Sequence, residues 1–252
     1  MTDKSGWERE HRVHFDDIVE EYDKVRGEYP QALYQDIFNY ASSGKNAIEI
    51  GAGTGKATAP FLMAGYHITA VEIGKNMVDY LTHKFAGNKQ LTLINDSFEN
   101  AIFDEDCFDI VYAATAFHWV DAAIGCPKVF KLLKKGGTFA LFRYNTRPSV
   151  GDALYDEIQS YYKKYYNTYY VKNKKPIRKT HDDFLMPSEI YRGFRFNCME
   201  QYGFSNATMK FYDGTINHSA SDYITLLNTY SDHRALPEEN RKTYMKVYMK
   251  RL

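Results

Sequence analysis

The chain has 252 residues, of which 44% are apolar, so it can bury a sizeable core as one domain or one domain with an insertion. Its 32 Lys and Arg balance 32 Asp and Glu, and a net charge of zero does not favour a general nucleic-acid binder. The longest strongly apolar run, residues 110–119, is far shorter than the roughly 20 residues that span a bilayer.

Targeting and redox signals point to the cytoplasm. The polar start of the chain has no apolar signal core, so export is not expected. The three cysteines, Cys107, Cys126 and Cys198, lie far apart, which argues against a disulfide framework or a zinc site. We therefore expect a cytoplasmic protein with no metal and no membrane attachment, and the sequence leaves its oligomeric state open.

Residues 1–45 are expected to form an N-terminal helical cover. Apolar residues recur at helical spacing from Phe15 to Val25, and a second helix is expected after Pro30, which the first turn of a helix tolerates. A Ser-Ser-Gly stretch then ends this part of the chain.

From residue 46 onward, short apolar strands alternate with single helices. Helices are expected at about 56–64, 75–85 and 122–134, and strands at 47–50, 67–71, 91–94, 108–113 and 138–143. Strands separated by single helices pair in parallel through right-handed crossovers. Residues 46–147 are therefore predicted to be an α/β core, a doubly wound, mainly parallel Rossmann-like sheet with helices on both faces.

The composition changes after residue 147. Residues 148–202 are rich in Tyr, Lys and Arg and are expected to form a helical insertion after the fifth strand, either a lid over an acceptor pocket or an aromatic packing stripe. Residues 203–252 are expected to contain a strand at 204–212 and helices near 220–228 and 237–251.

Three glycines alternate in the turn 51–55, directly after the first strand and before a helix. Glycine lets the backbone turn sharply there and approach a ligand without a Cβ in the way. A dinucleotide fingerprint would need glycine at Lys56, and a phosphate loop would need glycine at Ile50 and a hydroxyl at Ala57. Both patterns fail, and the remaining E-x-G-x-G-x-G form needs no pyrophosphate.

The stretch IEIGAGTGKAT resembles the first motif of class I S-adenosylmethionine (SAM)-dependent methyltransferases. Later motifs match in order, and these are Glu72 at the end of the second strand, 95–99 after the third, 108–111 opening the fourth and 132–137 before the fifth. The stretches 22–30 and 113–121 are similar to the trans-aconitate methyltransferase-like, or methyltransferase type 11, subgroup. The likeness covers about residues 15–143 and returns weakly at 229–233.

The resemblance implies SAM as cofactor, S-adenosylhomocysteine as product and no metal. It places Glu72 at the ribose hydroxyls, Asp96 or Ser97 at the adenine amino group, and Phe98 and Ile73 at the faces of the ring. Glu49 orients the glycine turn or reaches the methionine amino group. The implied cofactor-binding residues are Glu49, Gly51, Gly53, Gly55, Glu72, Ile73, Asp96, Ser97, Phe98 and Ala114.

His118 follows the fourth strand, where the transferable methyl group is expected. A histidine there can take a proton from the acceptor, position it, or only shape the pocket. We favour positioning as its catalytic role, because a carboxylate acceptor needs no base. The residues expected to bind the acceptor are Tyr22, Arg26, Trp119, Arg143 and Tyr144, the first two of which are also candidates for the cofactor carboxylate.

The favoured function is methyl transfer to an oxygen or nitrogen of a small molecule, an anionic one if the basic residues of 148–202 take part. Three alternatives remain: a methyltransferase for RNA or protein, a nicotinamide (NAD)-dependent dehydrogenase, and a non-catalytic SAM-fold binding module. An N-P-P-Y-type amine-methylating motif is missing after the fourth strand, which argues against the methyltransferase for RNA or protein.

The family fold usually ends in an antiparallel hairpin, whereas this chain stops at Leu252, within the last expected helix. We therefore expect either a truncated end or a sheet edge that a partner or another segment covers.

Overall fold

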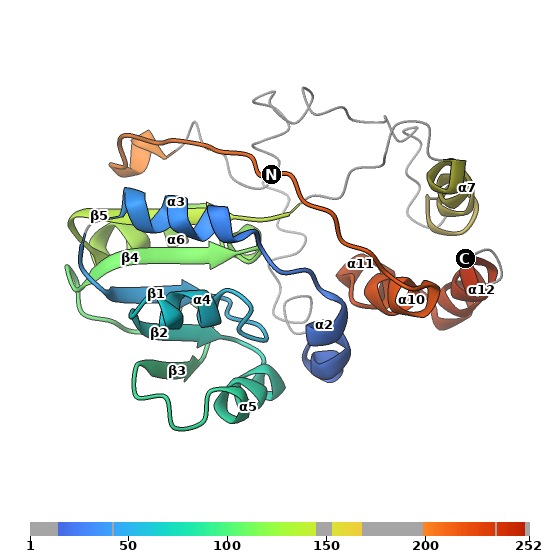
Figure 1. The fold of residues 1–252 in the computed structure, drawn as a ribbon, viewed down its shortest axis with the longest axis horizontal. Helices are drawn as coiled ribbons and strands as arrows, with labels where there is room; N and C mark the ends of the chain where they lie inside the picture. The colour runs from blue at the N-terminus through green and yellow to red at the C-terminus, as the bar shows by residue number, and fades with distance from the viewer. Residues whose placement is uncertain (1–14, 42, 145–152, 168–198, 235, 250–252) are drawn as a thin grey trace. The chain divides into compact units, whose positions relative to one another are not determined.

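The computed structural model describes residues 15–41, 43–144, 153–167, 199–234 and 236–249 (Figure 1). The chain divides into two compact units. The first comprises residues 1–19, 27–144 and 190–215, and the second residues 20–26, 145–189 and 216–252. None of the described helices combines the length and the apolar character that crossing a bilayer requires.

The first unit is built on a five-stranded parallel sheet in the order β3-β2-β1-β4-β5 (Figure 1). Its strands are β1 (Asn46–Ile50), β2 (His67–Glu72), β3 (Leu91–Asn95), β4 (Phe108–Ala114) and β5 (Leu133–Phe142). The chain runs from β1 outward to β3 and then returns to the other side of β1 with β4. This reversal of direction is a topological switch point, where ligands of such sheets bind.

Helices cover both faces of the sheet, as predicted. Successive strand residues point to opposite faces, so Ala47 joins one apolar core and Ile48 the other. The helices that pack into the Ala47 core are α3 (Gln31–Tyr40), α4 (Thr58–Met63) and α5 (Lys75–Lys84), and α3 and α4 lie in front of the sheet in Figure 1. The Ile48 core is closed by α6 (Ala122–Leu132). The doubly wound α/β fold is therefore confirmed.

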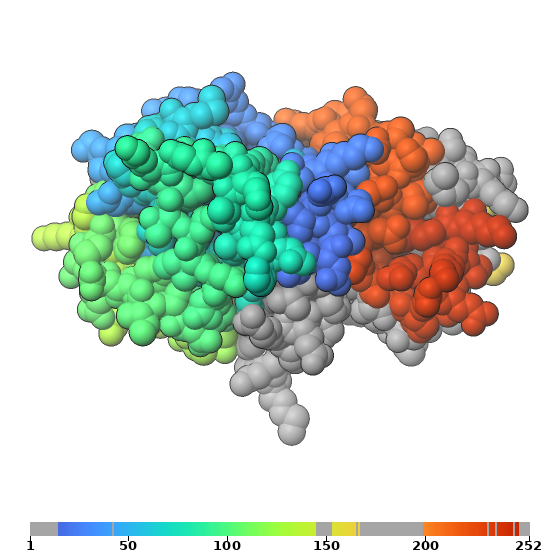
Figure 2. Space-filling model, turned by 90° about the horizontal axis from the view of Figure 1, so that it is seen from below, coloured from blue at the N-terminus to red at the C-terminus, as the bar shows by residue number. Residues whose placement is uncertain are grey.

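Three short helices complete the described part of this unit: η1 (Asp16–Ile18), η2 (Phe117–Trp119) and η5 (Glu200–Tyr202). Of these, η1 lies against α5, because the Met77 amide donates to Asp16 Oδ1 over 3.0 Å. In the view from below, blue atoms of the N-terminal segment lie beside the green atoms of α5 (Figure 2).

The strand expected at 204–212 is not present, and residues 204–219 have no regular structure. Asn206 has a left-handed φ of +57°, which interrupts an extended backbone. The segment is held by side chains instead: the Phe204 ring lies 5.5 Å from that of Phe130, and the Tyr212 hydroxyl donates to Asp36 over 2.6 Å. Apolar spacing alone suggested a strand, but no described strand pairs with these residues.

The second unit is helical in its described part. Its elements are most of α2 (Val19–Val25), α7 (Ala153–Tyr161), the π-helical η3 (Tyr162–Asn167), α10 (Ala220–Asn228), α11 (Ser231–Arg234) and α12 (Glu238–Met249). Leu227 and Met245 form its small apolar core. The start of the expected insertion, residues 153–167, is helical, while residues 145–152 and 168–198 lie outside the described residues.

Candidate functional site

The carboxyl ends of the five strands meet at one edge of the sheet, because all five strands are parallel. The chain leaves this edge through the turn 51–55 after β1, beyond Glu72 at the end of β2, and through Asp96 after β3. It leaves β4 through Thr115 to Trp119 and β5 through Arg143. Most of the predicted cofactor and acceptor residues therefore share this edge.

The glycine turn after β1 is a tight loop held by the neighbouring strand. The amide of Gly51 donates to the Val71 carbonyl over 2.8 Å. Gly51 has a φ of +69°, and a Cβ on it would lie 2.6 Å from the Cβ of Ala116. Gly53 has a φ of +57°, but nothing lies within 4 Å of the position its Cβ would take. Gly51 is thus required by packing, whereas Gly53 leaves open space for a ligand.

Glu72 joins the end of β2 to the glycine turn. Its Oε2 accepts the Gly53 amide over 2.8 Å, and its Oε1 accepts the Gly74 amide over 2.9 Å. Burial raises the pKa of this carboxyl group, and hydrogen bonds from the backbone amides of Gly74, Gly53 and Ile73 oppose the increase. A carboxylate has about four lone-pair positions, so at least one remains for a hydroxyl donor of a ligand.

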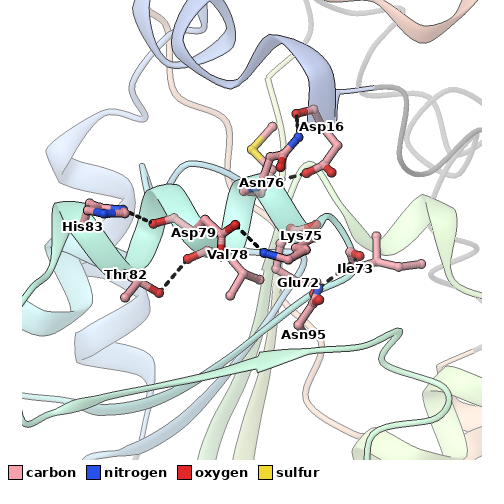
Figure 3. Close-up of polar contacts among 11 residues, drawn as sticks. Asp16, Glu72, Ile73, Lys75, Asn76, Val78, Asp79, Thr82, His83 and Asn95 are labelled. Carbon is pink, nitrogen blue, oxygen red and sulfur yellow. Dashed lines mark hydrogen bonds and ion pairs between the residues drawn. The ribbon is translucent and has the colours of Figure 1, made fainter.

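Asp16 and Asn95 support the same corner of the site (Figure 3). The Asn95 side-chain amide donates to the backbone carbonyls of Glu72 and Ile73, over 3.0 and 3.2 Å, and so fixes the end of β2 to β3. Asp16 contacts the first turn of α5 through the Met77 amide, and its backbone carbonyl accepts the Asn76 side chain over 3.0 Å. Asp16 was missed from the sequence, because its contacts lie some 60 residues away along the chain.

Glu49 is fully enclosed beneath the glycine turn, with 1% of its surface exposed. Its Oε2 accepts hydrogen bonds from Thr58 Oγ1 over 2.5 Å and from the Tyr112 hydroxyl over 3.0 Å. Its Oε1 has no partner among the described residues. Burial raises the pKa of Glu49 to about 8, so the carboxyl group is largely protonated near neutral pH.

The turn after β3 carries the predicted adenine contacts. Asp96 Oδ1 accepts the amide of Ser97 over 2.7 Å, and Ser97 Oγ accepts the amide of Asn100 over 3.3 Å. Phe98 is 3% exposed and belongs to the core under α6. In this conformation its ring packs within the protein.

His118 lies in η2, after β4, and packs against Trp119 with ring centroids 4.9 Å apart. Its Nδ1 is buried and has no partner among the described residues. Burial lowers the pKa of His118 to about 4, with a smaller contribution from the charge of Arg143. The imidazole is therefore neutral at physiological pH, beside a guanidinium cation.

Tyr29 and Thr115 also contribute to the edge near β4 and β5. The Tyr29 hydroxyl lies 2.6 Å from Thr115 Oγ1, and the Tyr29 ring is 5.7 Å from that of Tyr144. Thr115 has a φ of +54°, an uncommon conformation for a threonine that is typical of functional turns. Neither Tyr29 nor Thr115 was singled out from the sequence, although both fall within the stretches that carry the family resemblance. Ala114 ends β4 next to Thr115.

Tyr22 and Arg26 belong to the second unit. The Arg26 guanidinium lies over the Tyr22 ring at 4.9 Å and over the Tyr230 ring at 4.6 Å. Arg26 also donates to Thr229 Oγ1 over 2.9 Å and to the Thr229 carbonyl over 2.6 Å. These contacts join α2 to the stretch 229–233 that carries the weak likeness, while the expected roles of Tyr22 and Arg26 toward cofactor or acceptor stay predictions.

The known proteins to which this chain is similar are methyltransferases. Residues 48–141 match the model of a methyltransferase domain family. An uncharacterized methyltransferase of Mycobacterium tuberculosis is 31% identical over 139 residues, 55% of each chain. A probable S-adenosylmethionine-dependent methyltransferase of Saccharomyces cerevisiae is 28% identical over 151 residues, 57% of this chain and 50% of that protein. The chain thus spans about half the length of these curated relatives.

Among solved structures, a putative type II methyltransferase from Anaeromyxobacter dehalogenans has a similar fold. It superposes with a TM-score of 0.54 and 16% sequence identity, over 88% of this chain and 86% of that one. At this level of identity the similarity shows the fold alone.

Proposed function

We propose that this chain transfers a methyl group from SAM to a small molecule, and the premise is that residues 48–141 match the model of a methyltransferase domain family. The observation that carries the proposal is the bond between Glu72 and Gly53, which puts an acid and an open glycine backbone side by side at the strand ends.

The residues present fit SAM. Glu72 retains an acceptor position for a ribose hydroxyl, and Gly53 leaves room for the nucleoside backbone. Glu49 Oε1 and Thr54 Oγ1 are buried polar atoms without partners among the described residues, and both lie at the glycine turn. Such atoms are costly unless a ligand or water satisfies them. We expect Asp96 or Ser97 to hold the adenine.

SAM supplies an electrophilic methyl group on a sulfonium centre when it is bound. Methyl transfer is an in-line displacement, so the contribution of this chain is to hold donor and acceptor at short distance in one line. Glu72 and the glycine turn fix the nucleoside end. His118, Trp119 and Arg143 follow the neighbouring strands and would hold the acceptor.

The acceptor that we propose is an anionic small molecule methylated on oxygen. Arg143 provides a cation near His118, and the lowered pKa of His118 makes it a weak base but a good neutral hydrogen-bonding group. A carboxylate acceptor is already deprotonated and needs positioning only. An amine or a phenol would need a stronger base than a histidine with a pKa of about 4.

Isothermal titration calorimetry with SAM, S-adenosylhomocysteine and NAD tests the cofactor. We expect the two sulfur nucleosides to bind and NAD not to bind. Glu72→Gln should weaken SAM binding about tenfold to a hundredfold, because it removes the charge from the hydrogen bonds to the ribose. Glu105→Gln is the matched control, since Glu105 is an exposed acid whose side chain pairs with the exposed Lys131. Binding of NAD in place of SAM would support the dehydrogenase instead.

A screen for S-adenosylhomocysteine release tests the acceptor. Carboxylic acids, phenols and amines are supplied with SAM, and turnover is expected with acids. Arg143→Gln should raise KM for the acid acceptor more than it lowers kcat. Turnover with amines or phenols alone would contradict the carboxylate assignment, and SAM binding without turnover on any class would support a binding module.

A further inference from the structure

Lys128 of α6 lies against the turn that follows β3. Its Nζ donates to the backbone carbonyl of Phe98 over 2.6 Å and to that of Glu99 over 3.2 Å, and it also donates to the carbonyl of Ala101. A lysine ammonium has three N–H donors. All three are directed at the carbonyls of this one turn.

The turn 97–101 is closed by its own hydrogen bonds. The Ser97 carbonyl accepts the amides of Asn100 and Ala101, over 3.1 and 3.0 Å, and Ser97 Oγ accepts the amide of Asn100. The chain continues from this turn into no helix, and Lys128 supplies donors to the carbonyls of Phe98, Glu99 and Ala101. Hydrogen bonds thus connect Ser97 to Ala101, whose carbonyl Lys128 contacts.

The ammonium group of Lys128 also lies close to two aromatic rings. Its Nζ lies 4.9 Å from the centroid of the Phe98 ring and 5.3 Å from that of the Phe103 ring. Burial lowers the pKa of Lys128, while the carboxylates of Glu99, within the turn, and Asp96, just before it, oppose the decrease. Lys128 thus interacts with the segment 96–101 through its hydrogen bonds, its ring contacts and the neighbouring carboxylates.

We propose that Lys128 is a positioning residue for base recognition: by holding the carbonyls of the turn 97–101, it sets where Ser97 and Asp96 meet the purine of the nucleoside. This inference rests on the proposed function, because it takes the turn after β3 to contact the base. Lys128 itself does not touch the ligand.

The test compares S-adenosylhomocysteine with its hypoxanthine counterpart, S-inosylhomocysteine, by calorimetry. The two ligands differ only at the edge of the base, so the ratio of their Kd values measures base recognition. In Lys128→Met we expect S-adenosylhomocysteine to bind about tenfold more weakly and the ratio to fall toward one. Lys128→Arg keeps the charge and the donors and should largely restore the ratio.

Lys131→Met is the matched control, because Lys131 lies on the same helix but is 65% exposed and pairs with the exposed Glu105. It should leave both Kd values unchanged. If Lys128→Met does not fold, Lys128→Gln takes its place in the same comparison. Melting temperatures are recorded for all variants.

The outcomes separate the two proposals. If wild-type protein binds neither ligand, the proposed function is wrong. If wild-type protein prefers the adenine ligand and Lys128→Met keeps the same preference, Lys128 is only a stabilising contact and the inference is overturned, whatever its melting temperature. A lower ratio in Lys128→Met with an unchanged ratio in Lys131→Met supports the inference.

Discussion

Glu49 shows what enclosure does to a single acid in this protein. The carboxyl group has one oxygen with two hydrogen-bond donors and one oxygen without a partner among the described residues. The glycine motif made Glu49 a candidate, but its protonation follows from burial under α4, which only the fold shows. Its pKa in the folded chain is about 8, against 4.5 for an exposed glutamate.

This shift predicts how stability depends on pH. The folded state binds a proton more tightly than the unfolded state, so the contribution of Glu49 is fully present below pH 4.5 and is lost as pH rises to about 8. Glu49→Gln cannot lose this proton. Urea unfolding from pH 5 to 8.5 should show the variant gaining stability relative to wild type, by at most about 1.4 kcal/mol per pH unit. The same series on Glu28→Gln, an exposed acid paired with Lys56, should show no such trend.

His118 makes a second prediction at the scale of one residue. Its lowered pKa of about 4 leaves it neutral across the range in which the proposed methyl transfer would be assayed. The pH dependence of kcat/KM for an acid acceptor should therefore have the same shape in wild type and in His118→Gln between pH 6 and 8. An inflection near neutral pH in wild type that the variant lacks would show that His118 titrates there and acts as a base.

At the scale of elements, most strands and helices could be predicted because each carries its own local pattern. β5 shows the limit. The sequence placed its start after Gly136 and Gly137, yet it begins at Leu133, because Leu133 pairs with Phe108 before an irregularity in the ladder. Glycines signal a turn locally, and pairing with β4 overrides that signal. Asp16 and Lys128 escaped prediction for a related reason: their partners are remote in sequence.

A comparison of Gly53, in the loop after β1, with Gly65 can distinguish the effect of backbone strain from the effect of ligand contact. Gly53 and Gly65 both have positive φ, +57° and +82°, and neither has an atom within 4 Å of the place that a Cβ would occupy. Alanine at either position should cost about 1 kcal/mol in unfolding free energy. Only Gly53→Ala should also weaken SAM binding, because Gly65 lies before β2, at the far end of that strand from Glu72. Equal SAM affinities in the two variants would place the nucleoside elsewhere.

The contribution of the hydrogen bond between η1 and α5 to the free energy of unfolding can be measured with two substitutions. Asp16→Ala leaves the Met77 amide at the start of α5 without its acceptor, which should cost about 1 kcal/mol, as loss of a helix cap does. Asp16→Asn keeps an acceptor oxygen and should cost less. Chemical denaturation monitored by circular dichroism would measure both, and equal losses would show that charge, not the hydrogen bond, matters.

For the whole molecule, the balance of 32 acidic and 32 basic residues bears on the choice of acceptor. A chain with no net charge lacks the long-range attraction that polyanions depend on, and such binding falls steeply with salt. Fluorescence anisotropy with a labelled RNA should therefore show no saturable binding at about 150 mM salt. Tight binding with a steep salt dependence would favour RNA over a small acceptor.

The hydrogen bond from Gly53 to Glu72 couples two sites that look separate along the chain. Removing the carboxylate leaves the Gly53 amide without this acceptor, so a substitution at position 72 also affects the loop at Gly53. The hydrogen bond also means that the glycine turn and the end of β2 are already connected before a nucleoside binds. Binding therefore requires little further ordering of the backbone.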